Sequence, residues 1–88
     1  MKIKKEFFLK EVGGMSIVVA TGREAGRFSG MINLNKTGEF IWKCLEQETN
    51  EKEILEKILE KYDVDEETAG RDLRCILQNL REQKILEE

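Results

Sequence analysis

The spacing of apolar residues changes near Asn35, and this change most constrains the fold. Before it, short apolar segments lie between glycines, a pattern typical of β-strands. After it, apolar residues recur every three to four positions, as in amphipathic helices. Strands followed by helices predict an α+β fold, in which a sheet packs beside a compact helical cluster.

The strand-forming part begins with a hairpin pattern. Apolar residues 7–9 and Val12 precede Gly13 and Gly14, and the apolar segment 15–20 follows them. Glycine adopts the positive φ angles of a tight two-residue turn without steric cost. We therefore expect the glycine pair to reverse the chain between two antiparallel strands.

A third strand is predicted over residues 30–34, after a connection over residues 21–29 that contains Gly22 and Gly26. In this short alternating segment, Ile32 and Leu34 are expected to face the core. A three-stranded antiparallel meander would leave this third strand at an edge of the sheet.

Three helices are predicted next, because capping residues precede each apolar stripe. Asn35 is the expected N-cap of the first helix, which should end near Glu48. For the second helix, Thr49 and Asn50 are cap candidates, Asn50 and Glu53 have the spacing of a capping box, and the apolar pattern stops near Tyr62.

The third helix should begin after Asp65, a good N-cap, and carry the longest apolar stripe. Its expected buried residues are Ala69, Leu73, Ile76, Leu77 and Leu80. Residues 83–88 are expected to fray or to form a short tail. Three strands followed by three helices resemble a winged helix-turn-helix plan.

Length and composition favour one water-soluble domain over residues 1–88. Apolar residues make up 40% and charged residues 38% of the chain, which suits a small core surrounded by solvated faces. No apolar run approaches the roughly 20 residues of a membrane span, and the N-terminal segment lacks a signal-peptide pattern. We therefore expect a cytoplasmic protein that does not enter a membrane.

Several chemistries lack their usual residues. There is no histidine, and Cys44 and Cys75 stand far apart, so no zinc site, Cys-His pair or disulfide is expected. Both cysteines are expected to pack in the core. No phosphate-binding glycine motif or nucleophile elbow is present, so the sequence predicts a non-enzymatic protein without metal or cofactor.

Two blocks of sequence resemble the family of coenzyme pyrroloquinoline quinone biosynthesis protein D (PqqD). The first is Gly-Met-Ile-Asn-Leu-Asn-Lys-Thr-Gly-Glu-Phe-Ile-Trp at 30–42, and the second is Tyr-Asp-Val-Asp-Glu-Glu at 62–67. Their order and spacing agree with the family pattern over nearly the whole chain.

The resemblance implies a peptide-recognition element that binds the leader of a ribosomally made precursor peptide. It also implies presentation of that peptide to a modifying enzyme, often a radical S-adenosylmethionine protein. In the family, the leader adds as a strand along the third strand and lies in a cleft shared with the third helix.

Applied to this chain, the resemblance selects two sets of peptide-binding candidates. The strand set is Ser29, Gly30, Met31, Ile32 and Asn33. No proline removes a backbone donor there, so an added strand could bond along this edge. The helix set is Arg71, Arg74, Leu77, Gln78 and Arg81. All but Leu77 share one polar stripe that could read acidic leader residues, or could simply be a solvated face.

Other functions remain open at this level. A winged helix-turn-helix regulator would place the third helix, with Arg71, Arg74 and Arg81, in the DNA major groove. The net charge of −3 and the acidic start of that helix argue against nucleic acid as a partner. A plain protein-interaction domain uses the same architecture, and free strand edges also allow a homodimer.

Overall fold

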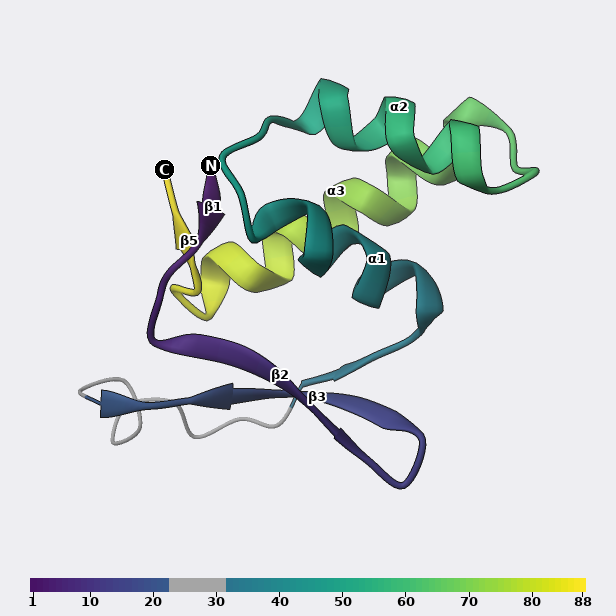
Figure 1. The fold of residues 1–88 in the computed structure, drawn as a ribbon. Helices are drawn as coiled ribbons and strands as arrows, with labels where there is room; N and C mark the ends of the chain where they lie inside the picture. Colours follow the sequence, from purple (N-terminus) through teal and green to yellow (C-terminus); the bar gives the residue numbers. More distant parts are fainter. Residues whose placement is uncertain (23–31) are drawn as a thin grey trace.

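The computed structural model describes residues 1–22 and 32–88, and it has an α+β fold (Figure 1). The elements, in order, are β1 (Lys2–Ile3), β2 (Phe7–Val12), β3 (Met15–Ala20), β4 (Asn33–Leu34), α1 (Lys36–Leu45), α2 (Glu51–Lys61), α3 (Glu66–Glu82) and β5 (Leu86–Glu87). The helices lie together on one side of the β2-β3-β4 sheet (Figure 1). The predicted order of a three-stranded antiparallel sheet followed by three helices is confirmed.

The central sheet is an antiparallel meander in the order β2-β3-β4. Val12 pairs with Met15, and the two glycines between them have φ angles of +58° at Gly13 and +81° at Gly14. Glycine adopts such angles at no steric cost, so the predicted hairpin turn is confirmed. Among residues 1–22 and 32–88, strand β4 pairs with β3 alone and forms one edge of the sheet.

Two helix starts depend on asparagine caps, as predicted. The side chain of Asn35 accepts a hydrogen bond from the Gly38 N–H at 2.8 Å, and that of Asn50 accepts from the Glu53 N–H at 2.9 Å. The Glu53 carboxylate in turn accepts a bond from the Asn50 side chain at 3.3 Å. Asp65 is the N-cap residue of α3 by position, and hydrogen bonding with Thr68, three residues later, lowers the pKa of its carboxyl group.

The prediction that residues 83–88 fray or form a tail was wrong. Leu86 and Glu87 form β5, which pairs antiparallel with β1 in a second, two-stranded sheet. Ile85 is fully buried and Leu86 nearly so, because the chain turns back from α3 and packs both side chains into the core.

A lysine in the left-handed conformation makes this reversal. Lys84 has a φ of +59°, and the Ile85 N–H donates to the Leu80 carbonyl at 2.9 Å. This hydrogen bond between the first and sixth residues of the turn is the one that defines a Schellman motif at a helix C-terminus. Glycine usually occupies this position. Its absence removes the sequence signal for the turn and for the strand that follows.

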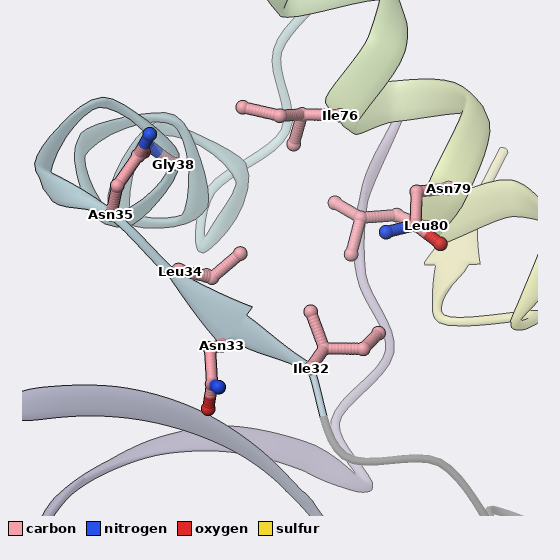
Figure 2. Close-up of a pocket in the computed structure, with 8 residues that line it drawn as sticks. All are labelled: Ile32, Asn33, Leu34, Asn35, Gly38, Ile76, Asn79 and Leu80. Atoms are coloured by element: carbon pink, nitrogen blue, oxygen red, sulfur yellow. The ribbon is translucent and has the colours of Figure 1, made fainter.

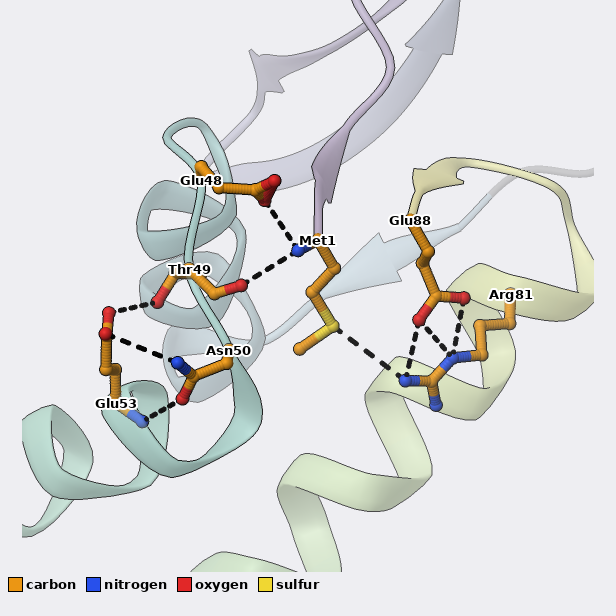
Figure 3. Close-up of polar contacts among 7 residues, drawn as sticks. All are labelled: Met1, Glu48, Thr49, Asn50, Glu53, Arg81 and Glu88. Atoms are coloured by element: carbon orange, nitrogen blue, oxygen red, sulfur yellow. Dashed lines mark hydrogen bonds and ion pairs between the residues drawn. The ribbon is translucent and has the colours of Figure 1, made fainter.

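The N-terminal residue holds the segment between α1 and α2 (Figure 3). The Met1 amino group donates to the Thr49 carbonyl at 2.9 Å and pairs with the Glu48 carboxylate, which lowers the pKa of Glu48. The Thr49 N–H donates to the Met1 carbonyl, so this residue cannot continue α1. The helix ends at Leu45, where the Glu46 N–H turns to the Lys43 carbonyl, before the predicted end near Glu48.

The core lies where α3 meets the other helices and the sheet. Its fully buried side chains include Ile41, Leu45, Ile54, Leu73, Leu77 and Ile85. The cysteine prediction was correct only in part. Cys44 is half-buried, whereas Cys75 is exposed on α3. No helix in the described part of the chain is long and apolar enough to span a membrane.

We predict that Ile85→Ala lowers the free energy of unfolding by about 2–5 kcal/mol, because it leaves a cavity beneath the terminal sheet. Glu87→Ala, at an exposed position of β5, should change stability by less than about 0.5 kcal/mol. Urea denaturation measures both values. A change for Ile85→Ala as small as that for Glu87→Ala would mean that β5 does not contribute to the core.

We predict that iodoacetamide alkylates Cys75 before Cys44. Burial raises the pKa of the Cys44 thiol, against a smaller opposing effect of Lys57, and only the thiolate reacts. Mass spectrometry of peptides from a time course at neutral pH measures the two rates. In a denaturant concentration that unfolds the protein, the two alkylation rates should become equal. Rates that still differ there would exclude burial as the cause.

Candidate functional site

A groove of about 220 Å³ opens between β4, the edge strand of the described sheet, and helix α3 (Figure 2). Its walls come from β4 with the residue before it, from the start of α1 and from α3. The lining residues are Ile32, Asn33, Leu34, Asn35, Gly38, Ile76, Asn79 and Leu80. Ile32 and Leu34 point from the strand toward α3, as the alternation predicted (Figure 2).

The backbone of β4 is oriented to accept a further strand. The Val18 N–H donates to the Ile32 carbonyl at 3.1 Å, so the backbone of Ile32 faces β3. Backbone groups alternate in direction along an antiparallel strand. The N–H and C=O of Asn33 are therefore directed away from β3, toward the outer edge of the sheet.

The junction between β4 and α1 fixes the end of the groove. Asn35 follows the strand directly and caps the helix through Gly38. A Cβ atom at Gly38 would stand 3.3 Å from the Cβ and Cδ2 atoms of Leu34, so glycine lets the helix start lie close against the strand. The short capped turn and this close approach hold the strand and helix in one arrangement.

The structure places the predicted strand residues as follows. Ile32 and Asn33 line the groove at the sheet edge. Ser29, Gly30 and Met31 lie outside the described residues, so their role in binding stays a prediction.

The predicted helix residues do not line this groove. Leu77 has an exposed fraction of 0%, so its side chain belongs to the core, and its contact with a peptide stays a prediction. Arg71, Arg74 and Gln78 are exposed, but successive helix residues lie about 100° apart, which places them on a different side of α3 from Ile76.

Arg81 already has partners within the chain. Its guanidinium contacts the Glu88 carboxylate at 3.1–3.2 Å, and its Nη2 atom lies 3.8 Å from the Met1 sulfur (Figure 3). Gln78 donates to Glu82 at 3.1 Å. A contact of the arginine stripe with a peptide stays a prediction, and such a peptide would have to extend beyond the groove.

Sequence reasoning missed the α3 wall of the groove. Ile76 and Leu80 fall within the apolar stripe, and the stripe alone does not separate core positions from those at its margin. Among residues 1–22 and 32–88, no three cysteine and carboxylate side chains gather in a way that could hold a metal ion.

Fold and groove together define a winged-helix-like α+β domain with an open strand edge beside a helix. Residues 16–86 match the family described as Coenzyme PQQ synthesis protein D (PqqD). Because this match covers most of the sequence, the chain belongs to the PqqD family.

Two solved structures share the fold. TbiB1, solved in complex with the TbiA(beta) leader peptide, is 28% identical with a TM-score of 0.77, over 99% of this chain and 95% of that chain. Lasso peptide synthetase B1, complexed with the leader peptide, is 17% identical with a TM-score of 0.74, over 99% of this chain and 96% of that chain. At that identity, the second likeness concerns the fold alone. A comparison with curated proteins finds no match.

We predict that Asn35→Ala and Asn50→Ala each lower the free energy of unfolding by about 1 kcal/mol, because each removes one helix cap. Only Asn35→Ala should also shift the backbone amide signals of Ile76 and Asn79 across the groove. Chemical denaturation and nitrogen-15 NMR measure the two effects. Equal amide shifts in both variants would show that the Asn35 cap does not fix the groove.

Proposed function

We propose that this protein binds the leader of a ribosomally made precursor peptide along the free edge of β4 and presents it to a modifying enzyme. One observation carries the proposal: an outward-facing strand backbone lies directly beside a groove with apolar walls. Main-chain bonds along such an edge give affinity, and a neighbouring groove gives side-chain specificity.

Family membership and the similarity to TbiB1, which was solved with a leader peptide, support this function. In this proposal the protein performs no chemistry itself and acts in the cytoplasm. The enzyme that receives the peptide is a separate protein, of the radical S-adenosylmethionine class that often accompanies this family. The peptide, in turn, competes with any second copy of the chain that pairs along β4.

The partner peptide is accessible to experiment through the gene neighbourhood. A synthetic leader from a short precursor frame beside this gene can be titrated into isotope-labelled protein. We predict saturable shifts of the amides of Asn33, Leu34, Ile76 and Asn79. Unchanged amides in this set at high micromolar peptide, with shifts along α3 on adding duplex DNA, would support the winged-helix regulator instead.

Backbone methylation of the peptide tests strand addition directly. N-methyl groups placed one residue at a time remove one donor each, and only donors that face β4 contribute to binding. We predict a loss of affinity at every second position. A uniform loss, or none, would mean that the peptide does not bind as a strand.

Side-chain recognition in the groove has a matched pair of variants. Ile76→Ala should weaken leader binding by about tenfold, because it removes apolar contact area at the groove wall. Leu59→Ala removes a similar half-buried side chain from α2, outside the groove, and should leave affinity unchanged.

Sedimentation of the free protein measures whether a homodimer occupies the edge first.

A further inference from the structure

A second, smaller cavity of about 70 Å³ lies where the three helices meet. It has an apolar floor and a polar rim. Its lining residues are Thr37, Ile58, Tyr62, Val64, Thr68, Ala69 and Asp72. Val64 at its margin is 44% exposed, although most large apolar side chains of the described chain are covered.

The cavity and the groove beside β4 are bordered by neighbouring parts of α1 and α3. On α3, Thr68 and Asp72 line the cavity, and Ile76 and Asn79 line the groove. Spacings of four, four and three residues place all four on one side of the helix. On α1, Thr37 borders the cavity and the next residue, Gly38, borders the groove. A peptide leaving the groove along α3 therefore reaches the cavity.

The separation of the two sites matches a short extended segment. Their centres on α3 are about eight residues apart, or about 12 Å at 1.5 Å per helical residue. An extended peptide advances about 3.3 Å per residue. A side chain in the cavity would thus stand about four residues from the one seated in the groove.

Size and charge select the kind of side chain. Cavities of about 150 Å³ hold a benzene ring, so a cavity of about half that volume admits an aliphatic stem but no aromatic ring. Asp72 is exposed and takes part in none of the ion pairs of the described residues. The Lys61 ammonium lies 5.1 Å from the centre of the Phe40 ring and 5.9 Å from that of the Tyr62 ring, and it is in none of the ion pairs of the described residues.

We propose that this cavity is a subsite for a lysine or arginine of the leader, whose stem packs on Val64 and Tyr62 and whose charge pairs with Asp72. The inference rests on the proposed leader binding and adds a specificity rule to it. Exposed Asp63, Asp65, Glu66 and Glu67 near the start of α3 add negative potential at this end. The leader therefore carries a basic residue about four positions from its groove residue.

A displayed library of random linear peptides, selected on the full chain, tests this rule without knowledge of the natural leader. We expect the selected peptides to share an apolar residue and, about four positions away, a lysine or arginine. Selected peptides whose binding depends on Ile76 but which lack the basic residue would overturn the subsite and leave the proposed function intact. A library that yields no binder dependent on Ile76 would overturn both.

A double-mutant cycle on one selected peptide then isolates the charge pair. Norleucine in place of the lysine keeps the stem and removes the charge. Asp72→Asn should weaken binding of the lysine peptide by about two- to fivefold and leave the norleucine peptide unchanged. High salt should reduce the difference, because the pair is exposed.

Two further variants separate the stem from the charge. Val64→Ser, at an exposed position, should weaken the lysine and norleucine peptides equally. Glu67→Gln removes an exposed carboxylate of the same helix that lines neither site, so it should weaken binding of the lysine peptide less than Asp72→Asn does and leave the norleucine peptide unchanged. Equal responses of both peptides to Asp72→Asn, or a Glu67→Gln effect as large as that of Asp72→Asn, would overturn the charge pairing.

Discussion

The burial of one face of α3 is the constraint on which the rest of the structure depends. Leu73 and Leu77 are fully buried, and α1, α2, the sheet and the terminal strands all contribute to the same core. Each apolar side chain of this size contributes about 1.5–3 kcal/mol when removed from water. The margin of that face has a different use, because Ile76 and Asn79 remain open beside β4. Rotating α3 to bury Ile76 further would therefore close the groove.

Much of the fold could be predicted because local signals and tertiary structure agree. Gly13 and Gly14 are at the positive φ angles that a two-residue hairpin needs, and Asn35 and Asn50 cap the helices they precede. The terminal sheet could not be predicted. Its strands have two residues each, too short for a visible alternation, and Lys84 occupies the left-handed position where glycine would have marked the turn.

The candidate site was predictable on the strand and not on the helix. Side chains and backbone groups both alternate in direction along a strand, so only two arrangements are possible. In the sheet order found here, the arrangement that places the Ile32 side chain toward the core also directs the Asn33 backbone outward. A helix has no such binary choice. The apolar stripe of α3 merges core and groove positions, so sequence could not distinguish buried Leu77 from half-exposed Ile76. The charged stripe of α3 predicted arginines as peptide contacts, whereas the α3 wall of the groove consists of apolar and amide side chains.

An open strand edge is an aggregation hazard, and the described part of β4 limits it by being short. The same shortness limits what main-chain bonding can give a ligand. At about 0.5–1.5 kcal/mol net for each hydrogen bond, a few bonds along so short an edge contribute only a few kcal/mol. Micromolar binding requires about 8 kcal/mol. Side chains seated against α3 must therefore supply most of the free energy of binding in such a domain. That wall consists of particular side chains rather than repeating backbone, so recognition there depends on the ligand sequence. Strands whose side chains do not fit the groove therefore bind the edge only weakly.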